Sequence, residues 1–215
     1  MSSRSSRPPS RTNTQRPLRS PGARGRAAPP PRARRWIWPA AALGVLVVLV
    51  GGFLLFRATR APSLDGVVTF SGANVERGHK AGPITYPQTP PVGGVHNEVW
   101  QNCGIYDKPV ANENAVHSLE HGAVWITYRS DLPADQVEQL RKLARGHGHV
   151  LLSPYPNLPA PVVASAWGVQ LKIEGSSNPA SDPRLPLFIQ KYEQGTQTPE
   201  PGASCRNGTG NPIEQ

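Results

Sequence analysis

The first 60 residues contain neither aspartate nor glutamate, and the first acidic residue of the chain is Asp65. Twelve of the 23 basic residues, all arginines, fall in this stretch. Residues 61–215 therefore carry 11 basic residues against all 14 acidic ones, a net charge of −3, although the whole chain has a formal charge of +9. This asymmetry excludes a uniformly basic protein and predicts two parts with different surroundings.

Residues 1–35 also lack aromatic side chains, and Leu18 is their only large aliphatic one. With ten arginines, seven prolines and six serines, they cannot bury enough apolar surface to offset the entropy of ordering, which predicts a disordered tail. The absence of aromatic residues for base stacking disfavours nucleic-acid binding. We expect this tail to be cytoplasmic and to contact anionic lipid through its arginines.

Residues 36–56 contain no charged side chain at all. A helix of this length spans roughly 30 Å, the thickness of a bilayer's hydrocarbon core. The run is too long for the apolar region of a cleaved signal peptide, and no small-x-small cleavage site follows it. The sequence therefore predicts a single-pass transmembrane helix. Ten arginines before it against two after it predict a cytoplasmic N-terminus.

The remainder of the chain is then extracytoplasmic. We expect a linker at 57–64, one folded domain at 65–205 and a flexible C-terminal tail at 206–215. Turn-forming residues dominate the first part of the domain, and denser apolar patterns follow. Strands are expected at 67–70, 123–128, 149–152 and 162–173, the last bent near Gly168, and helices at 132–146 and 182–192. The predicted fold class is a small, loop-rich α+β domain in which two helices cover one face of a short sheet.

Cysteine and methionine are scarce: Cys103 and Cys205 are the only cysteines, and Met1 is the only methionine. Both cysteines fall in the predicted extracytoplasmic part, where an even number favours a disulfide. Without CxxC spacing, two free thiols that ligate a metal are disfavoured. A soft site for Cu(I) is disfavoured for the same lack of sulfur ligands.

Four of the six histidines lie between residues 79 and 121. His96 follows the run PPVGG, and His117 and His121 bracket Glu120 in AVHSLEHG. Imidazole is a common ligand of borderline transition metals, so we expect a metal bound by His96, His117 and His121, with His79 or Glu120 completing the shell. If residues 112–121 form a helix, Glu120 lies beside the two histidines, whereas in a strand it points to the other side.

A structural role for these four histidines stays open, and a protease site is disfavoured. The histidines could simply hydrogen-bond buried backbone in a loop-rich domain. The sequence HSLEH also matches the pattern of inverted zinc metalloproteases, but Gly122 and the strand after it leave no room for the long helix that the pattern needs. His147 and His149 follow a predicted helix end, where a structural role is favoured.

A set of motifs spread over roughly residues 65–205 resembles an uncharacterised bacterial family, the domain-of-unknown-function family numbered 3105. The set comprises His79, Tyr86, PPVGGVH ending at His96, Trp100, GxY ending at Tyr106, Glu113, VHSLEHG ending at Gly122, Tyr128, AWG ending at Gly168 and PEPGAxC ending at Cys205. Similar members are typically anchored or exported, so the resemblance implies the same topology. It implies no activity, and the positions it carries over are His79, His96, His117, Glu120 and His121.

The leading hypothesis is an extracytoplasmic domain that binds zinc or copper, with no organic cofactor. One alternative is a cell-envelope enzyme that uses a metal-activated water or a histidine–glutamate acid/base pair. Another is a non-catalytic interaction module whose histidines are structural.

The predicted topology can be tested in intact cells. Externally added protease should digest the part of the chain that follows residue 56, because a span with this charge asymmetry exports its C-terminal side. The measurement is immunoblotting of a C-terminal epitope before and after lysis. An epitope that is protected in intact cells and digested only after lysis would contradict the topology and, with it, the oxidising compartment of the cysteines.

Overall fold

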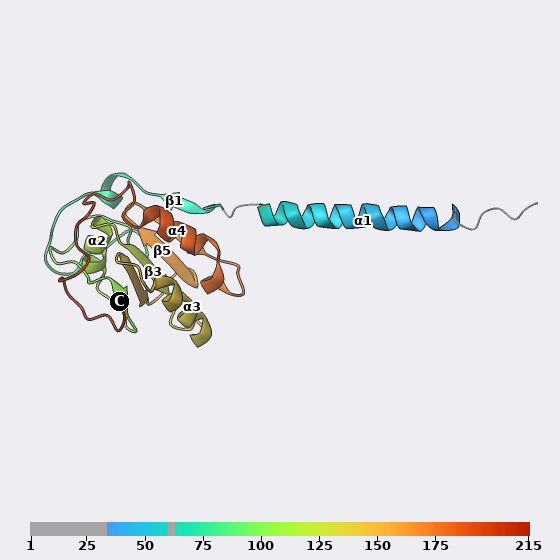
Figure 1. Ribbon diagram of the computed structural model, residues 1–215. Helices are drawn as coiled ribbons and strands as arrows, with labels where there is room; N and C mark the ends of the chain where they lie inside the picture. The colour runs from blue at the N-terminus through green and yellow to red at the C-terminus, as the bar shows by residue number, and fades with distance from the viewer. Residues whose placement is uncertain (1–33, 60–62) are drawn as a thin grey trace, which may run out of the picture. The chain divides into compact units, whose positions relative to one another are not determined.

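The computed structural model describes residues 34–59 and 63–215 (Figure 1). The predicted disordered tail lies, except for its last two residues, outside the described residues. The chain divides into two compact units, Met1–Thr59 and Arg60–Gln215, and each is described by itself.

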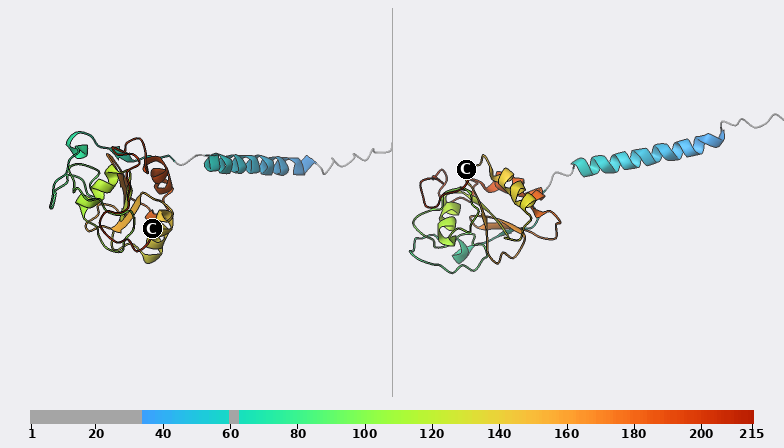
Figure 2. Two further views of the ribbon diagram at one scale, coloured as in Figure 1. Left: turned by 60° about the vertical axis from the view of Figure 1, so that its left-hand side comes forward. Right: turned by 90° about the horizontal axis from the view of Figure 1, so that it is seen from below.

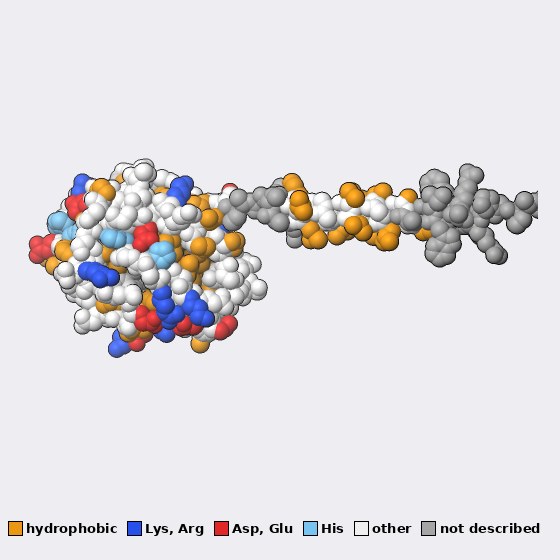
Figure 3. Space-filling view, in the orientation of Figure 1, with side chains coloured by type: hydrophobic (Ala, Val, Ile, Leu, Met, Phe, Trp, Pro, Cys, Tyr) orange, Lys and Arg blue, Asp and Glu red, His pale blue; other side chains and the backbone are white. Residues whose placement is uncertain are grey.

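The first unit contains helix α1 (Arg34–Thr59), which starts two residues before the predicted apolar span and runs past its end. Its described large apolar side chains are exposed, including Val48 at 72% and Leu55 at 69%, and they lie along the helix in Figure 3. Among the described residues, no helix meets the length and apolarity needed to cross a membrane. The transmembrane assignment of residues 36–56 therefore stays a prediction.

The second unit is built on a six-stranded mixed sheet with strand order β1-β6-β5-β3-β4-β2 among the described residues. The strands are β1 (Val67–Thr69), β2 (Gly104–Ile105), β3 (Val124–Tyr128), β4 (Val150–Pro154), β5 (Val162–Ala166) and β6 (Val169–Ile173). Strands β2, β3 and β4 run parallel, and β5, β6 and β1 continue the sheet antiparallel. The described part of this unit also contains three α-helices, α2 (Asn112–Glu120), α3 (Ala134–Ala144) and α4 (Arg184–Tyr192). Helix α2 lies between β2 and β3 in the chain, α3 between β3 and β4, and α4 after β6. Two short 3-10 helices span Gly72–Val75 and Pro179–Ser181.

The two helices predicted at 132–146 and 182–192 are α3 and α4, which lie on one face of this sheet as expected. Helix α2 covers the other face, so helices cover both faces (Figure 2). On one side, Leu140 of α3 and Phe188 of α4 pack with Ile126 in one buried cluster. On the other side, Leu119 of α2 packs with Trp125 in a second one. Successive side chains of a strand point to opposite faces, so β3 supplies both clusters. Every residue of β3 is buried, as expected for a strand covered on both sides.

One expected strand also differs from the sequence-based expectation. The expected long strand at 162–173 is a hairpin, in which β5 and β6 pair antiparallel around Trp167 and Gly168. Gly168 has a φ of +71°, a value that favours glycine and allows the chain to reverse here instead of bending. The α+β class is correct, although the sheet is larger than predicted.

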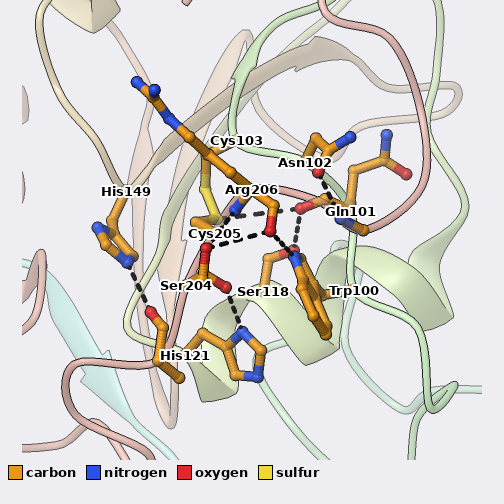
Figure 4. The surroundings of a disulfide bond; sticks show 12 residues. Trp100, Gln101, Asn102, Cys103, Ser118, His121, His149, Ser204, Cys205 and Arg206 are labelled. Atoms are coloured by element: carbon orange, nitrogen blue, oxygen red, sulfur yellow. Dashed lines mark hydrogen bonds between the residues drawn. A yellow bond between two sulfur atoms is a disulfide. The ribbon is translucent and has the colours of Figure 1, made fainter.

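The C-terminal residues 200–214, called the C-terminal strap below, lie along the outer edge of the sheet. Backbone hydrogen bonds of 2.8 Å join Ile105 of β2 to Glu214 and Ile213, so this segment has fixed partners where a flexible tail is predicted. The disulfide Cys103–Cys205 ties the strap to the residue before β2, with a Cα–Cα distance of 5.4 Å (Figure 4). The strap thereby covers an edge strand that would otherwise leave backbone groups unpaired.

Replacing Cys103 and Cys205 together by alanine should lower the free energy of unfolding. The disulfide closes a loop with a sequence separation of 102 residues, and a loop of about 100 residues corresponds to a loss of up to roughly 4–5 kcal/mol in the chain-entropy model. Urea unfolding of the oxidised chain and of the C103A/C205A variant measures the difference. Equal unfolding midpoints would contradict a stabilising role of this crosslink.

Candidate metal centre

The C-terminal end of α2 brings two candidate ligands, His117 and Glu120, into the interior. All six residues from Ala115 to Glu120 are buried, so this part of the helix is enclosed on every side. Gly122 ends it at a φ of +90°, and its N–H donates to the Leu119 carbonyl while that of Ala123 donates to Ser118. This pair of bonds is the Schellman motif, which needs a left-handed residue at the glycine position. The helical alternative for residues 112–121 is therefore correct.

The loop before α2 supplies His96, which is fully buried. The PPVGG run leads the chain close to a neighbouring segment, since a Cβ on Gly93 would lie 2.9 Å from the Asn74 carbonyl oxygen. An isolated parallel β-bridge then pairs His96 with His79, and their ring centroids are 4.9 Å apart. The bridge places the two imidazoles on the same side although 17 positions separate them in the sequence.

Three histidines of the cluster are oriented by backbone carbonyls. The Nδ1–H of His96 donates to Gly94 at 2.8 Å, that of His117 to Asn97 at 2.7 Å, and that of His121 to Ser204 at 2.8 Å. A neutral imidazole that donates through Nδ1 carries its lone pair on Nε2, which is the tautomer used by many metal-ligating histidines. The backbone thus leaves the lone pair on Nε2 of each ring available to bind a metal ion.

Glu120 lies where its carboxylate meets both an imidazole and a guanidinium group. Its Oε2 is 2.9 Å from Nε2 of His96, yet that buried nitrogen forms no hydrogen bond in the described structure. Its Oε1 accepts a 2.7 Å hydrogen bond from Nε of Arg77. Arg77 also donates to Glu200 at 2.8 Å, so it bridges the helix end to the C-terminal strap.

Burial favours the neutral form of two imidazoles, those of His96 and His117. It lowers the pKa of His96, against the opposing effects of the Gly94 carbonyl and Glu120. Burial also lowers the pKa of His117 to about 4, with His121 and His96 adding to the decrease. For Glu120 burial alone would raise the pKa, but the hydrogen bond from Arg77 and the nearby charges lower it overall. His96 and His117 are thus favoured as neutral imidazoles and Glu120 as a carboxylate, the protonation states that metal ligands require.

One donor atom from each of His79, His96, His117 and Glu120 lies within 4.8 Å of the other three. Four tetrahedral ligands at about 2.1 Å from an ion lie about 3.4 Å from one another, so binding needs a closure of roughly 1.4 Å for the farthest pair. His121 is outside this group, which differs from the predicted ligand set. Its ring is 4.5 Å from that of His117 between centroids, but its Nε2 faces Glu200 at 3.5 Å.

Comparison with protein families gives a match over residues 79–207 to a family described as Protein of unknown function (DUF3105). The chain belongs to the DUF3105 family. The resemblance inferred from the sequence motifs is thus confirmed, and all the candidate ligands lie within the matched residues. Neither the curated proteins nor the solved structures contain a match to the chain.

Two residues of this DUF3105 domain were not singled out by the sequence: Arg77 and Glu200, which complete the surroundings of Glu120. Glu200 lies within the motif PEPGAxC, which could have indicated it, whereas Arg77 is marked only by its position two residues before His79. The role of Glu120 also differs from that in HxxEH proteases. It belongs to the group that can share an ion, while His121 does not.

The two remaining histidines have partners away from this centre. Nδ1 of His147 lies 2.6 Å from Glu193, and Nε2 of His149 is 3.0 Å from the Ala203 carbonyl oxygen, to which it donates (Figure 4). Both contacts agree with the structural role expected from the sequence.

The metal-free protein should lose stability as the pH falls from about 7 to about 4. The pKa of His117 is about 4 in the folded chain against about 6.5 when unfolded, so the unfolded chain binds more protons in this window and is favoured by acid. This histidine alone accounts for a loss on the order of 3 kcal/mol. Urea unfolding of chelator-treated protein at several pH values measures it. The His117→Gln variant should show a weaker pH dependence, and an equal one would contradict the assignment.

Proposed function

We propose that this DUF3105 domain binds a borderline divalent transition metal through His79, His96, His117 and Glu120. The observation that carries the proposal is the contact between Nε2 of His96 and Oε2 of Glu120. These atoms are 2.9 Å apart and buried, and the imidazole proton is already committed to Gly94 through Nδ1. Two buried acceptors at this distance repel each other unless a proton or a cation lies between them.

The donor set favours zinc(II) or copper(II) as the cation. Three imidazole nitrogens and one carboxylate oxygen are ligands of borderline metals. Softer ligands are missing, because the two cysteines form a disulfide and Met1 is the only methionine. The hydrogen bonds that Nδ1–H of His96 and of His117 donate, and the one that Oε1 of Glu120 accepts, match the outer contacts that orient metal ligands.

Metal binding accounts for the cluster better than the two alternatives do. In a purely structural role, Nε2 of His96 would need a second proton to donate to Glu120 at 2.9 Å, and burial lowers the pKa of His96 and so opposes that protonation. In a hydrolytic enzyme, a free base would stand beside a metal-bound water. Glu120 is instead a member of the ligand group, and its second oxygen is held by Arg77.

We further propose that residues 36–56 anchor the domain in the membrane, with the domain on the extracytoplasmic side. The uncharged run, the arginine asymmetry around it and the exposed apolar side chains of α1 support this location. A disulfide in the domain is compatible with an oxidising compartment.

Full-length protein purified without a histidine tag should bind about one equivalent of zinc(II). Free zinc at about 100 times the dissociation constant should raise the free energy of unfolding by about 2.7 kcal/mol. Elemental analysis after dialysis and melting curves with and without chelator measure both effects.

The variants His96→Ala and His117→Ala should lose the bound zinc and the chelator-dependent change in melting temperature. The His147→Ala variant is the matched control, since this histidine pairs with Glu193 outside the centre. Wild-type protein that contains no metal and cannot be loaded would refute the proposal.

A further inference from the structure

Three of the four grouped side chains are fixed in place, and the fourth is not. His96 and His117 donate to backbone carbonyls, Glu120 accepts from Arg77, and all three are buried. His79 is exposed, and within the described residues its ring forms no hydrogen bond. Its ring lies beside two imidazoles, with ring centroids 5.1 Å from His117 and 4.9 Å from His96.

The side of the centre that carries His79 opens to solvent through a surface hollow. Arg77, Gly78, His79, Glu120 and Glu200 line this hollow, which has a volume of about 290 Å³. That volume is at the small end for ligand sites and suits one donor group of an incoming molecule.

The charges of the hollow favour a cation over an anion. Two carboxylates, of Glu120 and Glu200, face one guanidinium group, that of Arg77, which binds both. The lining thus carries a net charge of −1 while the imidazoles are neutral, and a negative concave surface concentrates cations. The carboxylate of Glu200 is 41% exposed, so it can meet an ion from solvent before the buried ligands do.

We propose that the centre is a transfer site, in which a divalent zinc or copper ion is cargo that enters and leaves at His79. This inference rests on the metal binding proposed above. An incoming nitrogen or oxygen donor displaces the His79 imidazole while His96, His117 and Glu120 still hold the ion. The ion keeps its charge and its number of ligands, and the displaced lone pair returns to the free imidazole. The closure required for four-fold binding falls on His79, because the other three ligands are fixed.

The test is the rate at which zinc leaves the protein. Full-length protein loaded with one equivalent of zinc(II) is mixed in a stopped-flow instrument with excess 4-(2-pyridylazo)resorcinol, whose absorbance reports the zinc it takes. The release rate should rise in proportion to the chelator concentration, because the chelator attacks through the hollow. A rate that does not depend on chelator concentration would show a closed site and would overturn the transfer proposal.

Variants separate this proposal from metal binding itself. His79→Ala should still bind one equivalent of zinc but should release it at least about tenfold faster, a change typical of weakened metal sites, whereas His117→Ala should bind none. The His147→Ala variant should release zinc at the wild-type rate. Loss of zinc from His79→Ala as complete as from His117→Ala would overturn the exchangeable role of His79. Wild-type protein that never binds zinc would refute the proposed function itself.

Discussion

The buried cluster of histidines and Glu120 is organised around one contact, between Nε2 of His96 and the carboxylate of Glu120. Burial of a carboxylate and of a nitrogen lone pair is costly unless each has a partner. Arg77 provides one for Oε1 of Glu120, and no hydrogen bond provides one for Nε2 of His96. A shared cation would satisfy both groups at once.

The sheet supports this contact without supplying any of its atoms. The grouped side chains come from the loop segments at His79 and His96 and from the buried end of α2, where Gly122 stops the helix. Helix α2 packs on the sheet through Leu119 and the buried strand residue Trp125. A rigid layer with variable loops at its surface is a common way to place functional side chains, and here it places ligands that are up to 41 positions apart in the sequence.

Residue patterns could predict the parts of the molecule that depend on local order. The helix at Ala134–Ala144, the strand at Val124–Tyr128 and the end of α2 at Gly122 follow from apolar periodicity and backbone conformation. The pairing of distant segments has no local signal. Arg77 bridges Glu120 and Glu200, which lie 43 and 123 positions after it in the sequence. The orientation of His121 depends on the Ser204 carbonyl, to which its Nδ1–H donates. Spacing predicted the histidine cluster, but only the three-dimensional contacts divide it into ligands and neighbours.

The disulfide also defines the chemistry of this centre. Pairing of Cys103 with Cys205 removes both thiolates as ligands, which leaves imidazole and carboxylate donors for the ion. The same bond holds the strap whose Ser204 carbonyl turns Nδ1 of His121 away from the ligand group. It also holds Glu200 opposite Arg77. The crosslink thus leaves imidazole and carboxylate groups as the donors in the proposed site and fixes the strap beside it.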